Sequence, residues 1–320
     1  MHALIHAIDA FFDHLAAVRW RFLGIAVLCH LARTVAVSRA WRNTLAAAYD
    51  GTRIRWRDVY LGYLAGAGVN AVIPARSGDV VKLYVLKRRV PGSTYTTLAS
   101  TLVVLTLFDF VVATSFFIWA VTSGFLPSLD VLPNLPNFDF SWFVRHRGWT
   151  LVIVGALAAA AFAAGVWAWE RVTGFKRRVA TGFAVLRDRG AYARRVALWQ
   201  ALDWAFRLVA VYWFLRAFGI PANADNALRI QVTQSLSTVF PFSPGGIGTE
   251  QAHALYVLAG QAGRSAVLAF SVGTHLTLIA VNVLLGAIAI AIAFRTFRLR
   301  QATAAAREAR REATAQTPSA

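Results

Sequence analysis

Long apolar stretches alternate along the chain with short segments rich in Arg and Lys. Five of the apolar stretches are long enough to cross the hydrocarbon core of a bilayer as a helix, which takes about 20 residues. They cover residues 21–39, 95–123, 150–169, 196–218 and 265–294. The pattern therefore predicts an all-α polytopic membrane protein.

Two further apolar stretches are interrupted near their middle. The first has halves at 59–73 and 77–86 around Pro74, and the second has halves at 227–240 and 249–262 around Pro244. Each half of about 10–15 residues is too short to span a membrane. We therefore expect two re-entrant broken-helix hairpins, with both prolines at tips near the midplane of the membrane and within one cavity.

The same order of span, hairpin and span occurs twice, at 21–123 and at 196–294, and the span 150–169 joins the two copies. An offset of 170 residues aligns Pro74 with Pro244, and an offset of 174 aligns Arg33 with Arg207. Because one span separates the copies, the second copy is upside down relative to the first. The sequence predicts an inverted repeat, an architecture in which paired broken helices surround the binding site.

The flanks of this transmembrane domain, 21–294, differ from it in character. Apolar residues recur at helical spacing in 1–20 opposite His2, His6, Asp9 and Asp13, which indicates an amphipathic helix at the membrane interface. Residues 295–320 form a basic tail rich in Arg, Glu and Ala, which we expect to be either helical or disordered and solvated in the cytoplasm.

Composition supports the membrane assignment. Hydrophobic residues make up 58% of the 320 residues and charged residues 15%, whereas a soluble domain carries about 25% charged residues. The net charge of +18 suggests nucleic acid at first, but the basic residues lie between apolar stretches rather than on a soluble face, so we expect no nucleic-acid partner. A single cysteine, Cys29, excludes a disulfide framework within the chain.

Basic residues are distributed unevenly between the two predicted sides. If both broken stretches return to the side they left, 22 Lys and Arg lie on one side, in 39–57, 87–89, 171–195 and from 295 onward, and six lie on the other. The positive-inside rule makes the first side cytoplasmic. We therefore expect a multi-pass protein of the cell inner membrane, with its N-terminus outside and its C-terminus in the cytoplasm.

The first broken stretch contains a cluster of polar residues from Asn70 to Lys82. Pro74 ends the entering helix, and Ser77 can N-cap the returning one, whose free N–H groups attract anions. Arg76 and Lys82 add positive charge, so the cluster predicts a site for a phosphorylated headgroup. The alternative is structural: Arg76 pairs with Asp79, which complements the helix dipole.

The second cluster runs from Phe240 to Glu250. Its glycines permit a tight non-helical crossing, followed by a helix with Thr249 as its N-cap and Glu250 in its first turn. Glu250 either holds the hairpin shape, with a salt bridge to Arg207 or Arg33, or it balances charge or couples protons beside the substrate. Both readings place a carboxylate at membrane depth, where ionisable residues are candidates for function.

Other ionisable residues at depth fall on the intact spans. Asp203 and Arg207 are four residues apart and form a pair on one helix, while Asp109, His275 and Asn282 are expected to bond neighbouring helices. Arg33 and Arg207 occupy matching places in the two copies and should contribute to anion recognition. Five basic residues at depth (Arg33, Arg76, Lys82, Arg207 and Arg216) face four carboxylates (Asp79, Asp109, Asp203 and Glu250), which leaves one positive charge for a phosphate.

These two clusters carry a family resemblance. The strings Ile-Pro-Ala-Arg-Ser-Gly-Asp-Val-Val-Lys at 73–82 and Phe-Pro-Phe-Ser-Pro-Gly-Gly-Ile-Gly-Thr-Glu at 240–250 resemble the lysylphosphatidylglycerol synthase transmembrane-region family of flippase-like proteins. The resemblance implies a polytopic protein of a bacterial inner membrane or an archaeal membrane. The best-understood members of that family move aminoacylated phospholipid between leaflets, and the lipid that this chain handles stays open. Leu105 and Thr106 stand where members often carry a Glu-Arg pair, and Lys82 stands where Arg is commoner. The residues matching the family's motifs, with Pro241 beside them, are Asn70, Pro74, Arg76, Gly78, Asp79, Pro241, Pro244, Gly245, Gly246, Gly248 and Glu250.

The sequence thus favours a lipid translocase that is not an enzyme, needs no cofactor and binds membrane lipids with an anionic or polar headgroup. No aminoacyltransferase domain follows residue 294 in this sequence, so we expect no lysine transfer. One alternative is a membrane enzyme acting on a lipid-linked glycan, although no Asp-x-Asp metal site is present. Another is an accessory protein that docks a separate lipid-modifying enzyme on the basic segments 171–195 and 295–311.

Overall fold

The computed structural model describes residues 13, 17–73, 77–122, 173–239 and 249–315, and every regular element in these ranges is helical. The predicted interfacial helix, the predicted span 150–169 and both hairpin tips fall mostly or wholly outside the described residues. Seven residues of the predicted site lie in these two tips, and only the arginine among them is charged: Pro74, Arg76, Pro241, Pro244, Gly245, Gly246 and Gly248.

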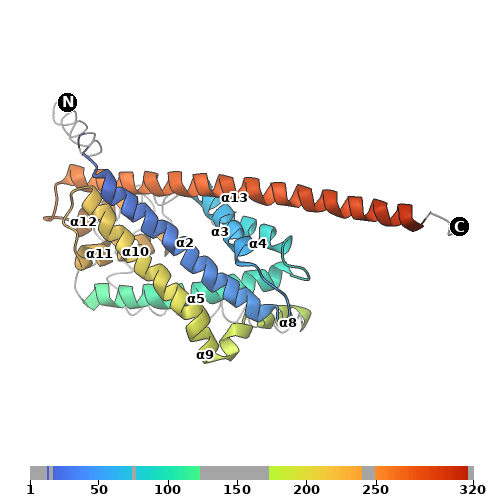
Figure 1. The fold of residues 1–320 in the computed structure, drawn as a ribbon. Coiled ribbons are helices and arrows are strands. Elements are labelled where there is room, and N and C mark those ends of the chain that lie inside the picture. The colour runs from blue at the N-terminus through green and yellow to red at the C-terminus, as the bar shows by residue number, and fades with distance from the viewer. Residues whose placement is uncertain (1–12, 14–16, 74–76, 123–172, 240–248, 316–320) are drawn as a thin grey trace, which may run out of the picture.

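Two long helices, α2 (Trp20–Ala48) and α10 (Leu198–Ala217), pack against each other at the centre of the bundle (Figure 1). Helix α2 continues well beyond the predicted end of its span at residue 39. The guanidinium of Arg39 lies 4.2 Å from the Trp56 ring centre, and Arg42 Nε donates to the carbonyl of Ile54 at 3.2 Å. The arginines that end the apolar pattern are thus held against the protein, so the helix is not interrupted there.

The first broken stretch forms two helices, α3 (Trp56–Val72) and α4 (Ser77–Lys87), that pack antiparallel. Their backbones touch: a Cβ added to Gly78 would lie 1.9 Å from the carbonyl oxygen of Gly66, and one added to Gly62 would meet Leu86. Asn70 Oδ1 accepts a 2.7 Å hydrogen bond from the Gly78 N–H near the tip. We call this pair hairpin 1.

The second broken stretch forms α11 (Ala224–Val239) and α12 (Thr249–Val257), also antiparallel, which we call hairpin 2. Side-chain amides link its arms. Gln234 Nε2 donates to Glu250 Oε1 at 3.2 Å, and Asn226 Nδ2 donates to Gln261 Oε1 at 2.9 Å. Helix α12 ends before the predicted residue 262, because the chain turns through Gly260 at a φ of 76°.

Each hairpin packs on the last helix of the other half. Hairpin 1 lies against α13 (Arg264–Ala315), where a Cβ on Gly68 would come within 2.6 Å of Gly286 Cα, while α11 of hairpin 2 packs on α5 (Tyr95–Thr122). Helix α13 continues through most of the predicted tail and extends beyond the body of the molecule (Figure 1).

The basic segments meet at one end of the bundle, which we call the basic end. Short helical elements lie there: α8 (Thr173–Gly182), η2 (Ala184–Arg187), α9 (Arg189–Tyr192) and the π-helical turn η3 (Ala193–Ala197). They pack on the end of α2 and the starts of α5 and α10, around a buried cluster that includes Trp41, Leu86, Leu98 and Val196. Helix α13 passes Tyr60 near this end before it leaves the body. The described parts of the basic segments, 39–57, 87–89, 173–195 and the start of the tail at 295, therefore share one end.

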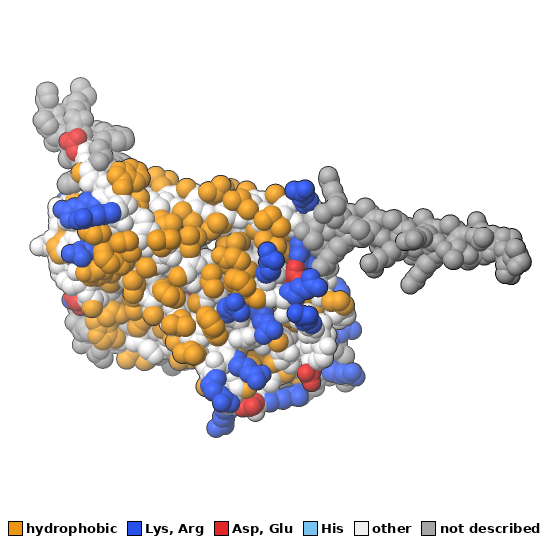
Figure 2. All heavy atoms as spheres, viewed as in Figure 1, with side chains coloured by type: hydrophobic (Ala, Val, Ile, Leu, Met, Phe, Trp, Pro, Cys, Tyr) orange, Lys and Arg blue, Asp and Glu red, His pale blue; other side chains and the backbone are white. Residues whose placement is uncertain are grey.

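Three helical stretches among the described residues are long and apolar enough to cross a membrane: Trp20–Ala48, Tyr95–Phe116 and Arg264–Arg295. Large apolar side chains such as Leu28, Phe110 and Leu284 are more than 60% exposed on them. Figure 2 shows hydrophobic side chains spread over the body, with Lys and Arg gathered towards its ends. An apolar belt between charged ends is the surface of a protein embedded in lipid.

Candidate functional site

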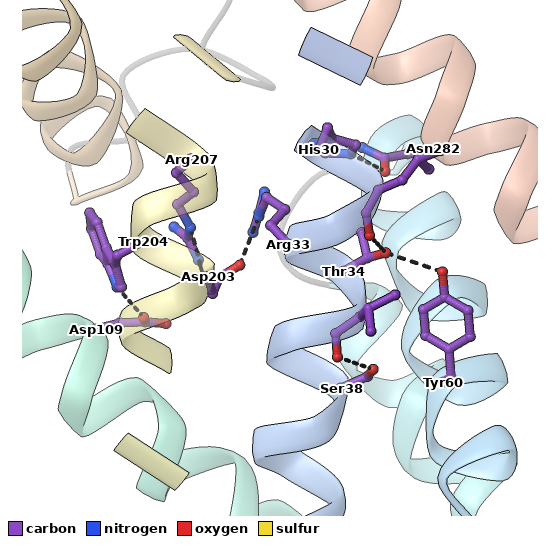
Figure 3. Close-up of polar contacts among 12 residues, drawn as sticks. His30, Arg33, Thr34, Ser38, Tyr60, Asp109, Asp203, Trp204, Arg207 and Asn282 are labelled. Carbon is purple, nitrogen blue, oxygen red and sulfur yellow. Dashed lines mark hydrogen bonds and ion pairs between the residues drawn. The ribbon is translucent and has the colours of Figure 1, made fainter. Parts of the chain in front are cut away.

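At the centre of the bundle, two arginines bind one carboxylate (Figure 3). Arg33 Nε on α2 donates to Asp203 Oδ1 at 2.9 Å, and Arg207 on α10 donates to Oδ2 through Nε at 2.9 Å and lies 2.7 Å away through Nη2. The Asp203 side chain is only 2% exposed. The predicted Asp203–Arg207 pair is therefore present, and Arg33 joins it from the helix packed alongside.

A hydrogen bond to a neighbouring helix flanks this cluster on each side (Figure 3). His30 Nε2 and Asn282 Oδ1 lie 3.0 Å apart and join α2 to α13, while Trp204 Nε1 donates to Asp109 Oδ1 at 2.9 Å and joins α10 to α5. Asp109 and Asn282 thus bond neighbouring helices, as predicted. His30 and Trp204 were not among the predicted site residues.

The two flanking bonds occupy matching places in the two halves. The offset of 174 that aligns Arg33 with Arg207 also aligns His30 with Trp204, and an offset of 173 aligns Asp109 with Asn282. Asp203 has no acidic counterpart, because Cys29 stands at the matching position. The two halves therefore supply two arginines and one carboxylate to this three-residue cluster, and the Asp109 carboxylate flanks it.

A cavity of about 230 Å³ opens beside this cluster, between α2, α10, α11 and α13. Its described lining carries two guanidinium groups but no Asp or Glu. Nη1 and Nη2 of Arg33 make no hydrogen bond within the part of the chain that the structure describes, and the side chain is 22% exposed. The residues that line the cavity are His30, Arg33, Arg207, Ala210, Val211, Phe214, Gln231, Gln234, Ser235, Thr274 and Leu278.

Glu250 lies near this cavity but bonds neither arginine. Its Oε1 accepts from Gln234 Nε2 at 3.2 Å, and its Oε2 lies 3.4 Å from His275 Nδ1 on α13. The expected salt bridge to Arg207 or Arg33 is therefore wrong in the described structure. Both arginines bind Asp203 instead, while α12, which carries Glu250, packs between α11 and α13. His275 does bond a neighbouring helix, as predicted.

The described residues of the first cluster bond within hairpin 1. Lys82 Nζ pairs with Asp79 Oδ1 at 2.7 Å and lies 5.1 Å from the Tyr63 ring centre, so Asp79 has a partner in Lys82 among the described residues. The predicted pairing of Arg76 with Asp79 lies outside them. Ser77 is the first described residue of α4 and its hydroxyl donates to the Ile73 carbonyl at 3.2 Å. Its predicted role as an N-cap stays a prediction, because residues 74–76 lie outside the described structure. Neither Asn70 nor Lys82 lines the 230 Å³ cavity.

Two more predicted positions are Thr249 and Arg216. Thr249 is the first described residue of α12, and its predicted role as an N-cap stays a prediction because the residues before it lie outside the described structure. Arg216 lies exposed in the last turn of α10, where its guanidinium is 5.3 Å from the ring centre of Phe22 and 5.7 Å from that of Trp213. It therefore sits at the end of the bundle, away from the central arginines, and adds no charge to the cavity.

The chain matches the model of a known family. A family described as the lysylphosphatidylglycerol synthase TM region matches residues 3–286, which confirms the resemblance carried by the two motifs. No curated protein matches the chain.

Proposed function

The chain belongs to the lysylphosphatidylglycerol synthase TM region family, and from this membership we propose that it moves a phospholipid, or another lipid with an anionic headgroup, between the leaflets of a membrane. The observation that carries the proposal is the cavity lined by Arg33 and Arg207. The chain acts here as a carrier of lipid and not as an enzyme.

Charge at the centre favours an anionic ligand. Arg33 and Arg207 share one carboxylate, so these three groups together carry one positive charge. A charged side chain at the centre of a bilayer costs at least about 2.5–3.5 kcal/mol, and a phosphate in the cavity would offset that cost. Guanidinium groups also match phosphate oxygens in geometry, which an ammonium group does not.

The size of the cavity fits a headgroup rather than a whole lipid. Its volume of about 230 Å³ is below the roughly 300 Å³ at which pockets for drug-sized ligands begin. Acyl chains would then stay in the bilayer, alongside the exposed apolar side chains of the long helices. In this arrangement, the headgroup crosses through the protein and the tails cross beside it.

We further propose that the basic end faces the cytoplasm of the cell inner membrane and that both hairpins are re-entrant. The shared position of the basic segments supports this orientation. A single cysteine placed at the exposed Arg189, in a Cys29→Ala background, should react with a membrane-impermeant maleimide only after the membrane is opened. Labelling of this cysteine in intact cells would contradict the proposed orientation and place the basic end outside the cell.

The function is tested by reconstituting the full chain in liposomes that contain fluorescent lipids of different headgroups. We expect the chain to speed the movement of phosphate-bearing lipids, measured by quenching from outside, but not that of a lipid with no phosphate. Arg76, outside the described residues, keeps its predicted role, so Arg76→Gln should stop this movement. Equal rates in empty and protein-containing liposomes for every lipid would reject the proposal.

A further inference from the structure

A second, much smaller cavity lies beside Glu250, between hairpin 2 and α13. Its volume is about 10 Å³, which is close to the minimum that one bound water molecule or a small ion needs. Four oxygen-bearing side chains line it among apolar neighbours. They are Gln234, Glu250, Ser271 and Thr274.

The polar groups around this cavity lack the partners that buried groups normally have. The hydroxyls of Ser271 and Thr274 are buried, with residue exposures of 4% and 5%, and make no hydrogen bond within the described structure. Buried hydroxyls without a partner are uncommon in proteins, and each one calls for an explanation. Here both line the same small cavity as a carboxylate.

Glu250 also lacks a partner with a fixed positive charge. Its side chain is 19% exposed, and the contacts that the described residues make with it are those of Gln234 and His275. A carboxylate at this depth in a membrane needs a compensating charge. A small cation in the cavity would supply it and would give both hydroxyls a partner.

We infer that Glu250, Ser271, Thr274 and Gln234 bind a small monovalent cation such as Na⁺. Carboxylate, hydroxyl and amide oxygens are the hard ligands that such ions prefer, and broken helices of membrane carriers supply sites of this kind. Bound there, the ion would tie hairpin 2 to α13. Gln234 and Thr274 also line the 230 Å³ cavity, so the ion would adjoin the proposed headgroup site.

The test is ion binding by the purified full chain, measured as thermal stability in NaCl and in choline chloride of equal ionic strength. The test variant is Ser271→Ala/Thr274→Val. Since these hydroxyls bond nothing in the described structure, we expect it to fold as the parent does in choline. The matched control is Thr277→Val on the same helix, whose hydroxyl bonds the Gly273 carbonyl at 2.7 Å and does not line the cavity.

Na⁺ should raise the melting temperature of the parent and of Thr277→Val by roughly 2–4 °C over choline, and leave Ser271→Ala/Thr274→Val unchanged. Radioactive ²²Na⁺ should be retained by the same two proteins and lost from the double variant. The inference would be overturned if Na⁺ had no effect on the parent, since the cavity would then hold only a water. An equal effect of Na⁺ on all three proteins would overturn it too. A melting temperature that follows pH but not Na⁺ would overturn it as well. Because lipid movement is not measured, this result is independent of the proposed transport.

Discussion

Hairpin 1 and hairpin 2 occupy matching places in the two halves of the chain but are built differently. In hairpin 1 the backbones touch at Gly66 and Gly78, and Asp79 and Lys82 bond each other within it. In hairpin 2 the arms are joined by side-chain amides, and polar groups such as Gln231 line the cavities. Hairpin 1 bonds its polar groups within itself, whereas hairpin 2 does so and also presents polar side chains such as Gln231 and Gln234 to the cavities.

This difference indicates a division of labour. Close glycine contacts bring hairpin 1 against α13 and fix its position, which suits a rigid support. Hairpin 2, together with α2, α10 and α13, surrounds both cavities, which suits a part of the protein that meets a ligand. The central cluster follows the same asymmetry, because each half supplies an arginine but only the second half supplies the carboxylate.

The largest expected effect on stability is that of removing this single carboxylate. Asp203→Asn leaves two arginines without their common partner, and breaking a buried ion pair from one side costs about 3–5 kcal/mol. The thermal stability of the purified protein should fall sharply. Asp225→Asn is the matched control, because Asp225 pairs with Arg229 at the same spacing but is 47% exposed, and it should cost at most about 1 kcal/mol. Equal stability of the two variants would contradict the central role of Asp203.

The backbone contact in hairpin 1 should tolerate no side chain. Gly78→Ala places a Cβ against the Gly66 carbonyl and the Asn70 side chain, which we expect to destabilise the protein by about 1–3 kcal/mol. Gly24→Ala in α2 is the control, since nothing lies within 4 Å of its added Cβ, and it should stabilise by about 0.5–1 kcal/mol. Melting temperatures of the two variants measure the difference. A Gly78→Ala protein as stable as the parent would mean that the two helices are not in contact.

Substitutions of polar residues in the two hairpins should have smaller effects, which differ in kind between hairpin 1 and hairpin 2. Asn70→Ala removes the hydrogen bond to the Gly78 N–H and should cost about 1 kcal/mol of stability. Gln231→Leu should leave stability nearly unchanged but slow lipid movement, because its side chain lines the 230 Å³ cavity. Thermal stability and liposome assays on both variants check this. If Asn70→Ala slowed lipid movement without loss of stability, and Gln231→Leu lowered stability instead, the roles assigned to the two hairpins would be wrong.

Hydropathy predicts the order and type of the described helices well, because burial in lipid imposes long apolar stretches. It places the end of α2 too early, since Arg39 and Arg42 look like residues of a connector until Trp56 and the Ile54 carbonyl are seen to hold them. The tail beyond residue 294 likewise gives no sign in hydropathy that α13 continues through it. Charged positions therefore mark where the apolar pattern ends, but not where a helix ends.

The central site is predictable only in part. The spacing of Asp203 and Arg207 on one helix predicts their pair, but the approach of Arg33 depends on the packing of α2 against α10, which no local pattern encodes. The partner of Glu250 was missed for the same reason, since His275 lies on another helix. His30 and Trp204 could have been found from the offset of 174 between the halves, which places them at matching positions.

The central claim is that the Arg33 guanidinium receives a lipid phosphate, and the most direct test is the rate of lipid movement by Arg33→Gln in liposomes. Asp203 keeps its two contacts with Arg207 in this variant, so the protein should fold. We expect the rate of movement of a phosphate-bearing lipid to fall about ten- to a hundredfold, because that factor corresponds to the loss of one charge-assisted hydrogen bond. Arg216→Gln, at the end of the bundle, should move lipid at the parental rate. An Arg33→Gln protein that is as fast as Arg216→Gln would contradict the claim.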